Sequence, residues 1–351
     1  MYHPLTQEEI RSRLTIPTGK LRLVIDTDAK NEVDDQFAIA WALRSKERFS
    51  VEAVYAAPFS HSSSPLGESE ESTLASALHG AADGPAHGME QSYQEILKLF
   101  SLLNEAPSGR VFRGSPGYLP AEGAIESDAV RDLIHRALES EEPLYVAAIA
   151  ALTNVASALL MAPEIARKLV VVWLGGQPLS FGHGFEYNLY QDVRAVQVVL
   201  NSGVPLVHIP CMGVASLLTT TEDELRCRLW DRSEIGRYLA QNCLDAFRKP
   251  EASIALMALN RQGYLKGQAD QSDAYFSQFP TQYVAWSRVI WDISTIAFLK
   301  NPNWVLTVET EAPTLNNDLT WDLTPRGRHL VRTATYCHRD MIFGDLFHAL
   351  G

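Results

Sequence analysis

The sequence predicts an α/β fold in which helices cover both faces of a mostly parallel sheet. Short, nearly continuous apolar runs rich in Val, Ile and Leu recur along the chain, as expected of strands buried on both faces. Segments with helical character separate these runs, which is the chain order of a parallel sheet. The 351 residues, 46% of them hydrophobic, are enough to bury a large core.

The chain opens with a β-α-β unit. Residues 21–25 (LRLVI) and 49–56 are predicted to be buried strands, and residues 31–44 the helix between them. Asn31 is expected to cap this helix, because Asn suits the N-cap and acidic residues favour the positive end of a helix dipole.

The alternation then continues to the end of the chain. Further strands are predicted over 111–114, 144–150, 169–174 and 204–209, and helices over 92–103, 128–139, 153–161, 192–201 and much of 222–265. From Trp304 onward the chain is expected to mix strands with a final helix over 340–350.

The chain shows no repeat or clear linker. We therefore predict one Rossmann-like domain over residues 1–351, with its core from about residue 21. Residues 60–88 are rich in Ser, Gly, Ala and Glu and predict a long insertion near the site.

The charge, apolar segments and cysteines of the chain limit the kinds of molecule it is expected to bind and the compartment in which it is expected to act. With 30 basic and 42 acidic residues the formal charge is −12, which argues against nucleic acid or an anionic membrane surface. Residues 1–20 lack the apolar core of a signal peptide, and no apolar run reaches the roughly 18 residues of a membrane helix. The four cysteines form no C-x-x-C pair, so we expect reduced thiols, no zinc site and a cytoplasmic location.

The most informative feature is an acidic cluster at the end of the first predicted strand. Asp26 and Asp28 follow the strand, and Asp34 and Asp35 come within a few residues. Ligands of open α/β sheets bind at the carboxyl ends of the strands. Carboxylates this close repel each other unless a cation neutralises them, and oxygen ligands favour Ca²⁺ or Mg²⁺. A solvated loop with capping carboxylates is the structural alternative.

Two other acidic motifs were compared with this segment. The loop of an EF-hand needs a spacing that Ala29-Lys30 does not match. A Mg²⁺-dependent phosphatase, with Asp26 as nucleophile, also begins strand-D-x-D. Lys30 stands where such enzymes carry Thr or Val, so this alternative stays open but is weakly supported.

Four segments in order resemble the inosine/uridine-preferring nucleoside hydrolases. Residues 26–43 (DTDAKNEVDDQFAIAWAL) are similar to the D-x-D-P-G-x-D-D signature, and 148–158 (AIAALTNVASA) to its L-T-N-x-A segment. Residues 186–192 (EYNLYQD) resemble its E-F-N motif, and Trp291-Asp292 its late metal-binding Asp. The resemblance runs from about residue 21 to the end of the chain and implies the nucleoside hydrolase fold.

The resemblance also implies a metal centre. Asp28, Asp35 and Asp292 would bind Ca²⁺ by their carboxylates, with Mg²⁺ as the alternative, and Thr153 would add its backbone carbonyl. Asp28 would also deprotonate the metal-bound water, while Asp26 would orient the neighbouring groups. The expected activity is hydrolysis of the N-glycosidic bond of ribonucleosides to ribose and free base. A homo-oligomer, a dimer or a tetramer, is implied as well.

Substrate contacts follow from the same resemblance. Asp34, Glu186 and Asn188 would hold the ribose hydroxyls, and Trp291 would stack on the base. Family members that tolerate pyrimidines often carry His where Trp291 stands, so the resemblance favours purine nucleosides. The loop after Asp28 is two residues longer than the signature, which leaves open the roles of Asp34 and Asp35. Two alternatives remain. The substrate could be another N-riboside, or the protein could bind a nucleoside or sugar without catalysing a reaction.

Overall fold

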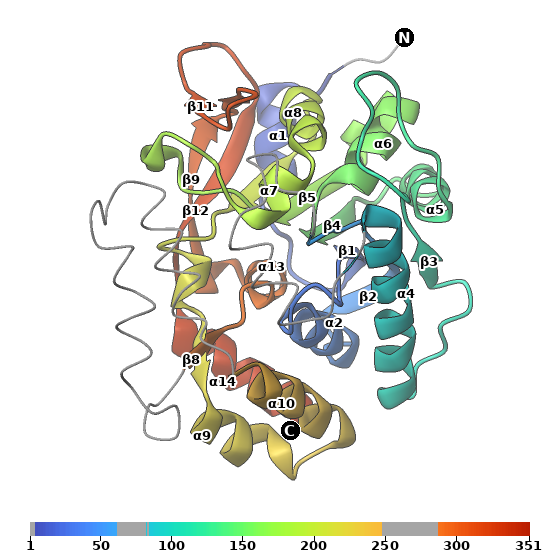
Figure 1. The fold of residues 1–351 in the computed structure, drawn as a ribbon. Coiled ribbons are helices and arrows are strands. Elements are labelled where there is room, and N and C mark those ends of the chain that lie inside the picture. Colours follow the sequence, from blue (N-terminus) through green and yellow to red (C-terminus); the bar gives the residue numbers. More distant parts are fainter. Residues whose placement is uncertain (1–3, 62–81, 83, 248–286) are drawn as a thin grey trace.

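A computed structural model describes residues 4–61, 82, 84–247 and 287–351 (Figure 1). Its centre is an eight-stranded sheet. In spatial order the strands are β3 (Val111–Arg113), β2 (Phe49–Ala56), β1 (Leu21–Thr27), β4 (Leu144–Ile149), β5 (Leu169–Leu174), β6 (Leu206–Ile209), β12 (Leu330–Cys337) and β9 (Val305–Glu311). All neighbours are parallel except β9, which pairs antiparallel with β12. The predicted fold class is confirmed.

The sheet order places the end of β1 at its centre. From β1 the chain moves outward to β2 and β3, then returns to form β4 on the other side of β1. In the register of the sheet, Asp26 lies beside Tyr55 of β2 and Ala148 of β4. Loops that leave neighbouring strands in opposite directions open a crevice between them, the usual ligand site of such sheets.

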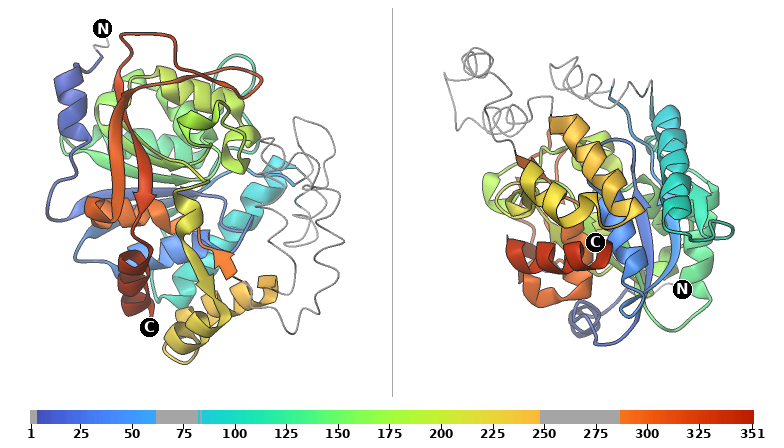
Figure 2. Two further views of the ribbon diagram at one scale, coloured as in Figure 1. Left: turned by 90° about the vertical axis from the view of Figure 1, so that its left-hand side faces the viewer. Right: turned by 90° about the horizontal axis from the view of Figure 1, so that it is seen from below.

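Helices cover both faces of the sheet (Figure 2). Side chains of β1 alternate between the faces, with Leu23 and Ile25 in one core cluster and Val24 in the other. The first cluster is shared with α1 (Gln7–Arg13), α2 (Asp35–Arg44), α4 (Pro85–Leu102), α10 (Glu234–Phe247), α13 (Ile293–Lys300) and α14 (Arg339–Leu350). The second is shared with α5 (Asp128–Leu138), α6 (Thr153–Met161) and α8 (Val193–Asn201).

Smaller elements complete the described chain. Two antiparallel pairs lie outside the main sheet: β7 (Thr219–Thr221) with β8 (Ser287–Val289), and β10 (Thr314–Leu315) with β11 (Trp321–Asp322). The short helices are α7 (Tyr187–Gln191) and α9 (Glu222–Leu225). No described helix has the length and apolar character needed to cross a membrane.

The strands agree closely with the predicted ones, but the starts of two helices were predicted wrongly. The helix expected from Asn31 begins at Asp35, and Asp34 occupies its N-cap position without a side-chain cap bond. Residues 28–34 instead form a loop before the helix, in which Asp28, Asn31 and Asp34 are buried. α4 begins at Pro85 rather than at residue 92. Most of the predicted insertion 60–88, and the part of 222–265 beyond α10, lie outside the described residues.

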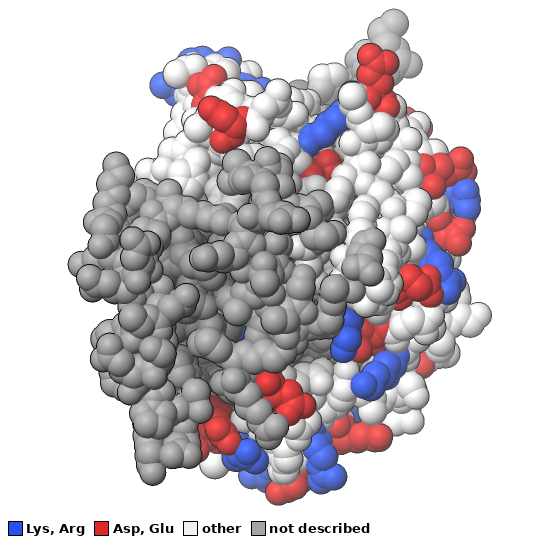
Figure 3. Space-filling model, viewed as in Figure 1, with Lys and Arg blue, Asp and Glu red and all other residues white. Residues whose placement is uncertain are grey.

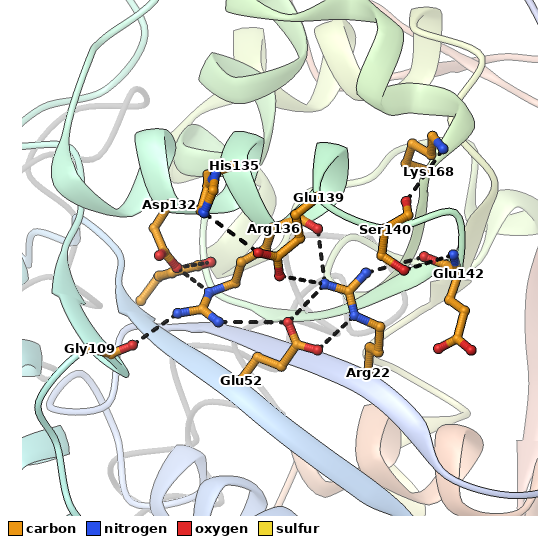
Figure 4. Close-up of polar contacts among 11 residues, drawn as sticks. Arg22, Glu52, Gly109, Asp132, His135, Arg136, Glu139, Ser140, Glu142 and Lys168 are labelled. Carbon is orange, nitrogen blue, oxygen red and sulfur yellow. Dashed lines mark hydrogen bonds and ion pairs between the residues drawn. The ribbon is translucent and has the colours of Figure 1, made fainter.

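A polar network ties β1, β2 and α5 together (Figure 4). Arg22 near the start of β1 contacts Glu52 of β2 at 2.7 Å and Glu139, just after α5, at 3.0 Å. Arg136 of α5 contacts Asp132 at 2.6 Å. Because Arg22 stands near the beginning of its strand, this network lies away from the carboxyl end that carries the acidic cluster and has a structural role.

Candidate active site

Asp26 is buried at the end of β1. Its Oδ1 accepts a 2.8 Å hydrogen bond from Asn154 Nδ2, whereas Oδ2 has no hydrogen-bond partner among the described residues. Burial raises the pKa of Asp26 to about 7, although the bond from Asn154 acts in the opposite direction. Asp26 therefore joins β1 firmly to α6, which follows β4.

Three buried carboxylates meet beside this contact. Asp34, Asp35 and Asp292 each offer an oxygen, and these oxygens all lie within 4.8 Å of one another. We call Asp34, Asp35 and Asp292 the carboxylate trio. Asp292 precedes α13 but makes no side-chain cap bond there, so its carboxylate is not used to end the helix. The sequence prediction of a cation site included Asp35 and Asp292, and these two residues do come together.

The trio is unfavourable without a cation. Burial is the largest cause that raises the pKa of Asp34 and Asp292 well above the usual range, and repulsion from neighbouring carboxylates adds to it. Burial raises the pKa of Asp35 to about 6, and the hydrogen bond that Thr27 Oγ1 donates to its Oδ1 acts in the opposite direction. Oxygen-only ligands at this spacing suit a hard divalent cation.

Asp28 borders the trio but does not belong to the closest group. Burial, followed by the charges of Asp35 and Asp34, raises its pKa well above the usual range. Its Oδ2 is buried and lacks a hydrogen-bond partner within the described part of the chain. A buried carboxylate oxygen without a donor is expected where a cation or a water molecule completes the site.

Thr153 begins α6 at the carboxyl end of β4. Its Oγ1 donates to Asp192 Oδ2 at 2.7 Å, which holds the Thr153 side chain in place. Asp192 also accepts hydrogen bonds from the backbone N–H groups of Leu119 at 2.8 Å and Ala195 at 3.0 Å.

The sequence prediction did not include Asn154, which links Asp26 to the backbone of Ser115.

Glu186 and Asn188 lie beyond the end of β5. Glu186 caps α7, where Oε2 accepts from Gly176 N at 2.7 Å and from Leu189 N at 3.1 Å. Burial raises the pKa of Glu186 to about 7. Asn188 Nδ2 donates to Leu174 O at 3.1 Å. Both polar side chains are therefore held at the carboxyl end of the sheet, where Asp26 also lies.

The expanded loop after Asp28 is held from several sides. Asn31 N donates to Asp28 O at 2.7 Å, which closes a tight turn. Gln36 Nε2 in α2 donates to Ala29 O at 2.6 Å. His61 Nε2, which follows β2, lies 2.8 Å from Asn31 Oδ1. The extra length is thus accommodated by a packed turn rather than by an open excursion.

Arg288 and Glu32 form an ion pair that sequence reasoning missed. Arg288 in β8 is completely buried, and its Nη2 lies 2.7 Å from Glu32 Oε2 in the expanded loop. Trp291 lies two residues after the end of β8, is half-buried, and packs against the first core cluster. This short segment therefore connects the expanded loop with Asp292.

The model of the family described as inosine-uridine preferring nucleoside hydrolase matches residues 23–336 of the chain. An uncharacterized protein of Schizosaccharomyces pombe is 37% identical over 105 residues, which are 28% of this chain and 34% of that protein. The pyrimidine-specific ribonucleoside hydrolase RihA of Salmonella enteritidis is 26% identical over 197 residues, 53% of this chain and 59% of RihA. The matched part of the chain spans less than two thirds of either relative.

Solved structures share the fold. The purine-preferring ribonucleoside hydrolase from Gardnerella vaginalis aligns with TM-score 0.63 at 17% identity, over 94% of this chain and 98% of that one. An inosine-guanosine nucleoside hydrolase aligns with TM-score 0.64 at 16% identity over the same shares. The type III effector XopQ, solved with adenosine diphosphate ribose, gives TM-score 0.55 at 14% identity over 99% and 100%.

Proposed function

Because the chain belongs to the inosine-uridine preferring nucleoside hydrolase family, we propose that it hydrolyses the N-glycosidic bond of ribonucleosides to ribose and free base. The observation that carries this proposal is the buried carboxylate trio at the carboxyl end of the sheet, with Glu186 and Asn188 nearby. A cluster of carboxylates with nearby polar side chains suits a cation together with a ligand that carries several hydroxyl groups, and it disfavours an apolar ligand.

The proposed cofactor is Ca²⁺, with Mg²⁺ as the alternative. Asp28, Asp35 and Asp292 would hold it by their carboxylates and Thr153 by its backbone carbonyl, while the closeness of Asp34 to the trio makes it a further candidate. When bound, a divalent cation supplies the positive charge that lets these buried carboxylates stay ionised and lowers the pKa of water.

In the proposed reaction, Asp28 accepts a proton from the attacking water. The water oxygen bonds to the anomeric carbon, the electron pair of the broken N-glycosidic bond goes to the base, and the base takes up a proton from solvent to leave as the neutral free base. Asp34, Glu186 and Asn188 would hold the ribose hydroxyls, and their negative charges and dipoles would stabilise the oxocarbenium-like transition state. Asp26 would act as a positioning residue through its bond with Asn154.

The proposed substrate class is purine nucleosides. Trp291 stands next to Asp292 and is half-buried, so part of its ring remains accessible for stacking on a base. RihA, a relative over about half the chain, is described as pyrimidine-specific, whereas two structural neighbours carry purine or inosine-guanosine names. Another N-riboside remains the alternative. A cytoplasmic location and a homo-oligomer remain predictions.

The phosphatase alternative has less support. Asp26, its required nucleophile, is completely buried, and its Oδ1 already accepts a hydrogen bond from Asn154, so it is not presented to a phosphate ester. A non-catalytic binder would have little reason to bury several carboxylates together.

A reducing-sugar assay across nucleosides, with and without chelator, tests the proposed function. We expect ribose release that depends on a divalent cation and that is abolished in Asp28→Asn. If no nucleoside yields ribose in the presence of Ca²⁺ or Mg²⁺, the proposal is wrong. Release of inorganic phosphate from phosphate esters instead would support the phosphatase.

A further inference from the structure

Glu32 is an additional carboxylate that the expanded loop brings to the candidate site. Arg288 Nη2 lies 2.7 Å from Glu32 Oε2, and Gln36 Nε2 donates to the backbone oxygen of Glu32 at 3.2 Å. The Arg288 side chain is 0% exposed, whereas that of Glu32 is 28% exposed. A buried guanidinium with a carboxylate partner is held in one geometry, so Glu32 is fixed in place.

The charge of Glu32 acts on both halves of the candidate site. Besides burial, it contributes to the raised pKa of Asp34 and Asp28 on the side of the expanded loop. It also contributes, after burial, to the raised pKa of Glu186 at the end of β5. The Glu32 side chain is 28% exposed whereas Asp28 and Asp34 are buried, so the Glu32 carboxylate is the more accessible of these groups to an incoming ligand.

We propose that Glu32, oriented by Arg288, is a substrate-binding residue that selects neutral ribosides over phosphorylated ones. This inference rests on the proposed nucleoside hydrolase function. Arg288 takes Oε2 of Glu32, so a hydroxyl group of the substrate would donate to Oε1. A phosphate ester at that position would instead bring further negative charge towards Glu32 and the trio.

The ion pair also makes Arg288 a poor site for a phosphate. Its side chain is completely buried, and Glu32 offsets part of its positive charge. Like charges several ångströms apart in a partly buried site repel enough to change relative binding by roughly tenfold or more. The length of the loop thus adds a specificity element that a shorter Asp28–Asp34 connection would not carry.

The test compares inosine with inosine 5′-monophosphate in Glu32→Gln, at fixed cation and ionic strength. We expect the wild-type protein to prefer inosine, and Glu32→Gln to raise the nucleotide-to-nucleoside ratio of kcat/KM by roughly tenfold. Glu8→Gln, an exposed glutamate in α1, is the matched control and leaves the ratio unchanged. A second readout is inhibition by ribose and ribose 5-phosphate, whose ratio of inhibition constants shifts in the same direction.

Glu32→Asp separates charge from shape and provides a second variant if Glu32→Gln folds poorly. Because it keeps the negative charge, we expect it to retain discrimination against the phosphate while weakening inosine binding. An unchanged ratio in folded Glu32→Gln overturns the inference. Complete inactivity of the wild-type protein on all nucleosides rejects the proposed function instead, so the two failures are distinguishable.

Discussion

Asn154 Nδ2 donates a 2.8 Å hydrogen bond to Asp26 Oδ1, and this contact fastens the start of α6 to the end of β1. Asn154 Oδ1 in turn accepts from Ser115 N at 2.8 Å, after β3. A single amide side chain therefore connects segments that follow three strands of the sheet. Because Asp26 is buried, its orientation depends on this donor.

Replacing Asn154 should disturb the site without unfolding the protein. In Asn154→Ala, Asp26 loses its donor, and we expect kcat/KM on nucleosides to fall about 10- to 100-fold, as is usual when hydrogen-bonding partners around a metal site are removed. Activity and circular dichroism are the measurements. Asn303→Ala, at an exposed position, is the control. Full activity in Asn154→Ala would mean that the contact with Asp26 is not needed.

Cation binding should stabilise the fold through Asp292. At a cation concentration 100 times its dissociation constant, binding adds about 2.7 kcal/mol to the free energy of unfolding. We expect Ca²⁺ to raise the Tm of the wild-type protein over that in chelator, and Asp292→Asn to lose most of this rise. Asp223→Asn, at an exposed position in α9, should behave as wild type. An equal rise in Asp292→Asn would exclude Asp292 as a ligand.

Base preference should depend on Trp291. Without the indole ring, a purine loses more stacking area than a pyrimidine, so kcat/KM for inosine should fall more than that for uridine in Trp291→Ala. An aromatic pair of this kind corresponds to a change of roughly three- to tenfold in the ratio. Trp291→Phe keeps an aromatic face and should preserve most of the preference. An unchanged ratio in the alanine variant would show that Trp291 does not contact the base.

His208 should make stability fall in acid. It is buried in β6, stacks on Trp173, and its Nε2 lies 2.8 Å from Gly175 O; burial lowers its pKa to about 4. A lowered pKa means that the unfolded chain binds the proton first. Its stabilising contribution is therefore complete above pH 6.5 and is lost as pH falls towards 4.

The pH effect can be isolated with His208→Gln, which does not titrate. The difference in free energy of unfolding between wild type and variant should shrink by about 3 kcal/mol between pH 7 and pH 4. Urea denaturation at several pH values measures it. A difference that stays constant with pH would contradict the neutral, buried state of His208.

The strands were predictable because each is a nearly continuous apolar run, as in 169–174, and such a run has few alternatives. The start of α2 could not be predicted. Asn31 suits an N-cap locally, but in the folded protein it contacts Asp28 and His61 instead. The cluster of aspartates could be recognised from the sequence motif. The residues that contact this segment could not be predicted, because Asn154 is 128 positions from Asp26 and Arg288 is 256 positions from Glu32. Such pairs depend on the tertiary fold.

On the face shown in Figure 3, Lys and Arg of the described residues are interspersed with Asp and Glu and do not gather into a patch.

The carboxylate trio joins residues from opposite ends of the chain. During synthesis, Asp34 and Asp35 leave the ribosome early, but Asp292 follows only when most of the protein has been made. Until α13 docks beside α2, the nascent chain has an incomplete set of cation ligands. If the proposed cation binds the trio, its capture would come late in folding and would stabilise a structure that has already formed rather than guide its formation.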